Sequence, residues 1–229
     1  MQSPDALRRT AVARGARPSA LPVSAHRVLR NTYALLALTL TFSAAIAAAS
    51  AALRLPHPGI LLTLAGYFGL LFLTTKFRDR ALGLVFVFAL TGFMGYTLGP
   101  VLNAYLALAN GAQLVMTAMG GTAAIFLGLS GYALASRRDF GLLGGFLGAC
   151  ILAAFLAGIG AIAFDLSGLS LAVSAMFVLL MSGLILFETG NIVRGGETNY
   201  VMATVTLYVT IFNLFTSLLQ LLGFAGRNG

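Results

Sequence analysis

Residues 81–136 read ALGLVFVFALTGFMGYTLGPVLNAYLALANGAQLVMTAMGGTAAIFLGLSGYALAS and contain no charged residue and no histidine. A helix needs about 20 apolar residues to cross roughly 30 Å of hydrocarbon. The stretch is long enough for two such helices, and Gly99-Pro100, followed by Asn103 and Asn110, predicts a kink or an end between them. This part of the chain is therefore typical of a membrane protein.

The same pattern extends over the whole chain of 229 residues. Hydrophobic residues make up 59% of it and charged residues only 9%, with a mean hydropathy of +0.95. Residues 31–53 and 140–164 are also free of charge. A soluble domain of this size needs far more charge to cover its surface. The composition predicts an all-α polytopic membrane protein in contact with lipid and without a soluble domain.

Prolines, glycines and charged residues divide the apolar sequence into seven predicted spans. The expected ranges are 32–53, 59–75, 81–103, 112–136, 141–164, 169–193 and 200–223. Residues 31–229 would thus form one seven-helix transmembrane domain. Residues 1 to about 30 carry arginines among Ala, Ser, Pro and Gly, which predicts a disordered tail.

The net charge of +8 and a pI near 10.4 are explained by topology. The basic residues stand at the ends of apolar runs rather than on a face interleaved with aromatic residues, so a nucleic-acid partner is not expected. Cytoplasmic segments of membrane proteins are enriched in Lys and Arg. With a cytoplasmic N-terminus, only Arg54 and Arg227 of the 14 basic residues fall outside. The alternation then predicts that the C-terminus lies outside.

Catalytic and metal-binding motifs are weak. Residues 128–131, GLSG, resemble the serine motif of rhomboid-type proteases, but a serine nucleophile needs a base within hydrogen-bond reach. His26 lies in the tail and His57 in a short outer loop, so neither can be expected to face Ser130. Cys150 is the only cysteine, and no Walker or zinc-protease motif is present. We expect no enzyme activity, no cofactor and no firm metal site.

Glu188 is the most informative single residue, because it follows about twenty uncharged positions and lies about one turn from the end of the sixth span. Ionisable residues inside a membrane usually face the bundle interior or a water path and find partners. The alternative is a carboxylate that reaches the cytoplasmic interface beside Arg194. The candidate partners are polar residues of the sixth and seventh spans and a basic cluster: Asn191, Thr210, Asn213, Lys76, Arg78 and Arg80.

Glycine pairs at GxxxG spacing allow two helix backbones to approach closely. Three such pairs occur: Gly95/Gly99, Gly141/Gly145 and Gly144/Gly148. They predict either a seam between two copies of the chain or, alternatively, packing between helices of one bundle.

In combination, several segments resemble the transmembrane Bax inhibitor motif family, and within it the bacterial YccA-type branch. The resemblance runs from about His26 to the end of the chain. Its carriers are 26–33 (HRVLRNTY), 93–105 (FMGYTLGPVLNAY), 186–192 (LFETGNI), 195–200 (GGETNY), 207–209 (LYV) and 213–215 (NLF).

The resemblance implies a bundle of six helices around a central seventh, in a bacterial inner membrane. In channel-like members of the family, an acidic residue at the end of the sixth helix pairs with an aspartate of the seventh, as a pH-sensitive latch on a calcium leak. The corresponding positions here are Glu188 and Thr210. A Glu–Thr pair cannot share a proton as two carboxylates do. The alternative function that the resemblance implies is a leak for calcium or protons, with Glu188 as its gate and as a calcium contact.

Proteins of the YccA type are associated with the membrane-anchored ATP-dependent protease FtsH, as a slowly processed substrate that restrains its activity. The resemblance therefore implies a modulator of FtsH. An unstructured cytoplasmic end is what a proteolytic motor can grip, and the tail offers one. The tail residues assigned to this contact are Arg8, Arg9, Arg14 and Arg17. The alternative is that the tail only sets topology and touches anionic lipid headgroups.

Overall fold

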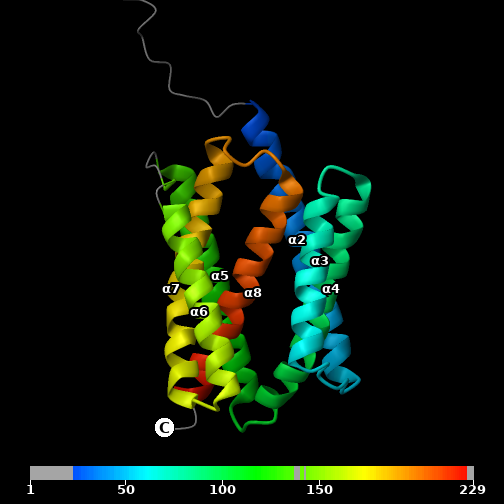
Figure 1. The fold of residues 1–229 in the computed structure, drawn as a ribbon, viewed down its shortest axis with the longest axis vertical. Coiled ribbons are helices and arrows are strands. Elements are labelled where there is room, and N and C mark those ends of the chain that lie inside the picture. The colour runs from blue at the N-terminus through cyan, green and yellow to red at the C-terminus, as the bar shows by residue number, and fades with distance from the viewer. Residues whose placement is uncertain (1–22, 137–139, 142, 226–229) are drawn as a thin grey trace, which may run out of the picture.

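Seven helices make up the computed structural model, which describes residues 23–136, 140–141 and 143–225 (Figure 1). Within these residues the chain forms no β-strand. The helices are α2 (Val23–Ala52), α3 (Ile60–Lys76), α4 (Ala81–Leu106), α5 (Gly111–Ala135), α6 (Leu143–Ala163), α7 (Ser167–Val193) and α8 (Tyr200–Ala225).

The helices match the predicted spans in number and, at most of their ends, to within three residues. Six of them are long and apolar enough to cross a membrane. The remaining helix, α3, is apolar but has only 17 residues, or about 25 Å at 1.5 Å per residue. The prediction of an all-α polytopic membrane protein is confirmed.

The first helix begins earlier than predicted. Residues 23–30 were expected in the disordered tail, whereas α2 starts at Val23. The reason is tertiary packing: Ala25 is buried, and Val28 and Leu29 pack against the hydrophobic core. The four tail arginines assigned to a protease contact lie outside the described residues.

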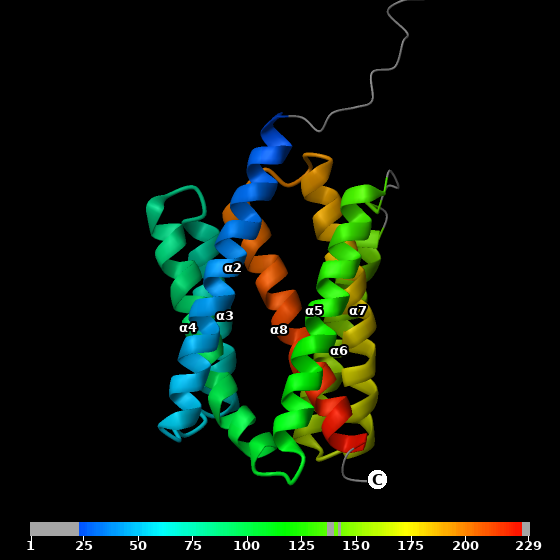
Figure 2. The same cartoon turned by 180° about the vertical axis from the view of Figure 1, so that it is seen from behind.

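Helix α8 is the central element, as the resemblance implied. It crosses the middle of the molecule, between α2, α3 and α4 on one side and α5, α6 and α7 on the other (Figures 1 and 2). Its main neighbours are α2, α4, α5 and α7, whereas α3 packs on α4 and α6 on α7. Burial follows this arrangement, because 44% of the most apolar stretch of α8 is buried and only 17% of that of α6.

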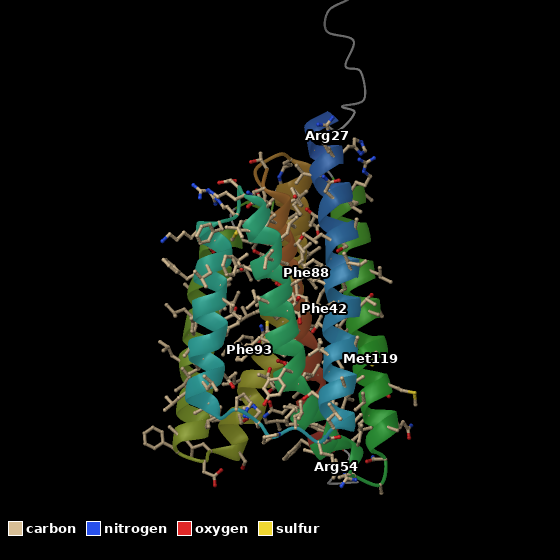
Figure 3. The ribbon with its side chains drawn as sticks, turned by 90° about the vertical axis from the view of Figure 1, so that its right-hand side faces the viewer. Arg27, Phe42, Arg54, Phe88, Phe93 and Met119 are labelled. Atoms are coloured by element: carbon tan, nitrogen blue, oxygen red, sulfur yellow. The ribbon has the colours of Figure 1, made fainter. Side chains whose placement is uncertain are left out.

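Small residues hold α2 and α4 together. A side chain at Gly95 would meet the Ser43 backbone, and one at Gly99 would meet Ser50. Phe42 and Phe88 add an edge-to-face contact with 5.4 Å between ring centroids (Figure 3). The Gly95/Gly99 pair therefore packs helices of one bundle against each other, which was the second of the two interpretations of its spacing.

Pro100 does not end its helix, because α4 continues to Leu106. A proline lacks the N–H that would bond the carbonyl four residues earlier, here that of Tyr96. The Ser50 hydroxyl donates a hydrogen bond to this carbonyl at 3.0 Å. The side chain of Asn103 in turn donates to the carbonyl of Ala51 at 2.9 Å, near the end of α2. The backbone polar group released by the proline is thus satisfied by the neighbouring helix.

Candidate functional site

Buried hydroxyl groups connect the central helix to its neighbours. The Ser43 hydroxyl of α2 lies 2.5 Å from the Tyr208 hydroxyl of α8. Tyr208 donates to the carbonyl of Thr91 in α4 at 3.2 Å, so Ser43 is left as the donor to Tyr208. Tyr208 is only 1% exposed, and a lone hydroxyl at such a place would be costly. The interaction therefore fixes α2, α4 and α8 relative to one another.

A second polar cluster joins α2, α5 and α7. The Thr189 hydroxyl lies 3.3 Å from that of Tyr33 and 3.4 Å from that of Ser130. Ser130 is the serine of the GLSG segment, and the hydroxyl group that it contacts is that of Thr189. His57 lies in the loop between α2 and α3, where it accepts a hydrogen bond from the Gly59 amide. Among the described residues, the hydrogen-bond partner of the Ser130 hydroxyl is Thr189 and not a histidine.

Glu188 lies on α7 about 7 Å from the end of the helix, at 1.5 Å per residue, and is half-buried. Within the described part of the chain its carboxylate has no hydrogen bond and no ion pair, with Arg194 or any other residue. Another acidic residue, Glu197, follows in the α7–α8 loop. The guanidinium of Arg194 instead lies 5.8 Å above the ring of Phe140.

The polar residues expected near Glu188 bond to their own segments. Thr210 donates to the carbonyl of Thr206 at 2.7 Å, and the amide of Asn213 donates to that of Val209 at 2.8 Å. The backbone carbonyl of Asn191 accepts from the Gly196 amide at 2.9 Å and so closes the turn after α7. A direct Glu188–Thr210 hydrogen bond is not formed.

The basic residues between α3 and α4 interact with neighbouring residues of the same segment. The ammonium of Lys76 and the guanidinium of Arg80 lie about 6 Å from the ring centroid of Phe77. Arg78 forms an exposed ion pair of 3.6 Å with Asp79. Among the residues that the structure describes, none of these three basic side chains pairs with Glu188.

Asn199 is a structural residue that the sequence analysis did not single out. Its side-chain oxygen accepts hydrogen bonds from the amides of Val201 and Met202, at 3.0 and 3.1 Å, and so caps α8. Its amide donates to Asp79 at 2.8 Å, which ties the α7–α8 loop to the α3–α4 loop. An asparagine directly before an apolar run is a signal for a helix N-cap, whereas the contact with Asp79 has no signal in the sequence.

A cavity lies on one face of α8. Its volume is about 520 Å³, and it is lined by residues of α3, α4, α6, α7 and α8. Thr210 and Asn213 line it, but Glu188 and Asn191 do not. The residues of the expected polar site therefore fall into two groups. Thr210 and Asn213 lie at the cavity, whereas Glu188 and Asn191 lie near the C-terminal end of α7.

The described residues include no group of three His, Cys, Asp or Glu side chains that could hold a metal ion. Tightly bound calcium takes six to eight oxygen ligands, commonly from several carboxylates. Glu188 belongs to no such group among the described residues.

The chain is similar over most of its length to known membrane proteins. The sequence model of the family described as "Inhibitor of apoptosis-promoting Bax1" matches residues 25–227. A protein of Escherichia coli K12 named "Modulator of FtsH protease YccA" is 52% identical over 206 residues, which cover 90% of this chain and 94% of that protein. An uncharacterised protein of Pseudomonas aeruginosa is 54% identical over 199 residues, 87% of this chain and 90% of the relative. An uncharacterised membrane protein of Vibrio cholerae is 42% identical over 204 residues, 89% of this chain and 92% of the relative.

Proposed function

The chain belongs to the family of inhibitors of apoptosis-promoting Bax1, and we propose that it is a multi-pass inner-membrane protein that modulates the FtsH protease. The observation that carries the proposal is the identity of 52% to a named modulator of FtsH, spread over 94% of that relative. The family model matches residues 25–227, which include nearly all of the seven helices, so the similarity is not confined to one segment.

The bundle supports a role in contact rather than in catalysis. The buried hydroxyl groups of Ser43, Ser130 and Tyr208 bond to groups on neighbouring helices, and that of Thr210 bonds to a carbonyl of its own helix. Ser130, the serine of the protease-like GLSG segment, bonds to Thr189. These groups stabilise helix packing, which suits a protein that acts by binding another membrane protein.

The N-terminal tail is the proposed handle for the protease. Residues 1–22 precede α2 and are rich in Ala, Arg and Pro, with few of the large apolar residues that a packed core needs. Because α2 begins at Val23, residues 2–20 can be removed without shortening a helix. This deletion removes Arg8, Arg9, Arg14 and Arg17 and keeps Arg27 and Arg30, which set the topology.

The test uses an E. coli strain that lacks its own 52% identical relative. We expect the full-length chain to co-purify with FtsH and to slow the degradation of an FtsH substrate. We expect deletion of residues 2–20 to lengthen the half-life of the protein, because the motor loses its grip. A variant in which the order of residues 2–20 is shuffled keeps charge and length and should be degraded at the normal rate.

Two failures are distinct. If the full-length chain neither binds FtsH nor changes substrate turnover, the modulator proposal is wrong. If binding and half-life are unchanged by the deletion, only the tail loses its role. The alternative of a cation leak gated by Glu188 stays a prediction, and the position of Glu188 outside the cavity gives it no support.

A further inference from the structure

The cavity beside α8 is bounded by two helix pairs. Helices α3 and α4 form one wall, α6 and α7 the other, and α8 the floor. Val205, Val209 and Phe212 contribute to the floor, and Phe93 (labelled in Figure 3) and Phe155 to the walls. We call this cavity the α8 groove. Its lining is mainly aliphatic and aromatic, so it favours an apolar occupant.

The α8 groove is continuous with the outer surface of the bundle. Two of its lining residues, Phe68 of α3 and Leu152 of α6, are 47% and 59% exposed. Phe72, one turn further along α3 from Phe68, is 65% exposed. Helix α6 is long and apolar enough to span a membrane, and α3 is a shorter apolar helix. We therefore expect the exposed apolar side chains of both helices to face lipid hydrocarbon. The groove therefore opens to acyl chains rather than to water.

The size of the groove selects among apolar occupants. A transmembrane helix about 10 Å wide and 30 Å long fills roughly 2,000 Å³. The groove offers about 520 Å³, which is the range of sites for a single small ligand. A helix of a partner protein, or of a second copy, is too large to enter. A single acyl chain is narrow, flexible and present at high concentration on this face.

From its lining, its opening and its volume, we propose that the α8 groove holds one acyl chain of a phospholipid from the surrounding bilayer. Phe68 of α3 and Phe155 of α6 meet edge to face with 5.9 Å between ring centroids, and the acyl chain would enter between the two helices beside this contact. It would lie against the central helix and fill space that no side chain of the described bundle occupies. This proposal does not depend on the interaction with FtsH.

The chain contains no tryptophan, so a single introduced tryptophan reports on one place. Phe212→Trp puts the reporter on the floor of the groove, and Phe72→Trp puts one on the lipid-facing surface. Each variant is reconstituted into vesicles of phosphatidylcholine with brominated acyl chains, which quench tryptophan on contact. We expect Phe212→Trp to be quenched to an extent comparable with Phe72→Trp.

A matched pair of glycines on α6 tests whether the groove itself is the path. A side chain at Gly148 or at Gly145 would meet no atom within 4 Å, and both positions are exposed, but only Gly148 lines the groove. Gly148→Phe should plug the groove and abolish most of the quenching of Phe212→Trp. Gly145→Phe should leave it unchanged. Circular dichroism and gel filtration check folding, and Gly148→Leu replaces Gly148→Phe if the larger side chain prevents folding.

Any of the following results would overturn the proposal. The first is a Phe212→Trp reporter that brominated chains do not quench. The second is quenching that survives Gly148→Phe, because the lipid would then reach Phe212 by another path. The third is efficient quenching by aqueous iodide or quenching by lipid that falls at high protein-to-lipid ratio, since these indicate water or a second copy in the groove.

Discussion

At the scale of single residues, the hydroxyl groups of this bundle are placed where they join helices. Ser43 and Tyr208 meet at 2.5 Å in the centre of the structure, and Tyr33, Thr189 and Ser130 form a second link. Interhelical hydrogen bonds inside membrane proteins contribute about 0.6 kcal/mol on average and up to about 1.7 kcal/mol. These links are therefore modest singly, and their geometry specifies which helices become neighbours.

The Ser43–Tyr208 pair should behave as one coupled interaction. Ser43→Ala and Tyr208→Phe should each lower the free energy of unfolding by about 1 kcal/mol, since each leaves a buried hydroxyl with one partner fewer. The double variant should lose less than the sum of the two, because the second change removes a bond that is already broken. The measurement is reversible unfolding in lipid–detergent bicelles.

Thr41→Ala is the matched control for the Ser43–Tyr208 pair. The Thr41 hydroxyl is exposed on the same helix and bonds only to the carbonyl of Ala37. Its removal should change stability by less than about 0.5 kcal/mol. Strictly additive effects of Ser43→Ala and Tyr208→Phe would show that the two hydroxyl groups do not interact.

At the scale of helices, α2 and α4 form the closest pair of the bundle. Gly95 and Gly99 let the backbones approach, and this approach brings Ser50 to the carbonyl that Pro100 leaves free. A proline within a transmembrane helix is tolerated when a neighbouring group satisfies the released carbonyl. The continuation of α4 past Pro100 to Leu106 is thus supported by a side chain of another helix.

Ser50→Ala should lower the free energy of unfolding only when residue 100 is a proline. Ser50→Ala leaves the Tyr96 carbonyl without its donor and should destabilise the protein by about 1–3 kcal/mol. Pro100→Ala supplies an amide that can bond the same carbonyl, so the double variant should regain most of the loss. Thermal unfolding of the three variants measures this.

A failure of Pro100→Ala to rescue Ser50→Ala would contradict this explanation. The loss would then come from the packing of Ser50 against Gly99 rather than from the carbonyl.

At the scale of the whole molecule, the two ends of the bundle differ in charge. Arg27 of α2 and the loop residues 76–80 and 194–199 lie at one end, where Asn199 bonds to Asp79. Arg54 lies at the opposite end from Arg27 (Figure 3). The concentration of basic residues at one end predicts that this end is cytoplasmic.

The orientation can be measured with reporter fusions. Alkaline phosphatase fused after Gly229 should be active, because that enzyme folds only in the periplasm. Green fluorescent protein fused after Gly195, in the α7–α8 loop, should fluoresce, because that loop is predicted to be cytoplasmic. The reverse pattern at both positions would show that the N-terminus is outside.

Much of the helical layout could be predicted from the sequence, and little of the polar site could. The charge-free runs gave the spans to within a few residues, except that α2 extends back to Val23 because Val28 and Leu29 pack on the core. Glu188 stands out in the sequence as an ionisable residue in an apolar run. Its partners were not predictable, because a single sequence does not say which side chains meet across helices.

The sequence by itself determined that this is a membrane protein of seven apolar helices with most of its basic residues predicted on one side. The physical reason is that hydrocarbon thickness and the cost of burying charge act on each segment separately, so both can be read along the chain. Only the tertiary structure decided that Ser50 satisfies the Tyr96 carbonyl, that Thr210 and Asn213 face a groove without Glu188, and that Asn199 ties two loops together. These are contacts between segments far apart in sequence, and they exist only once the helices have packed around α8.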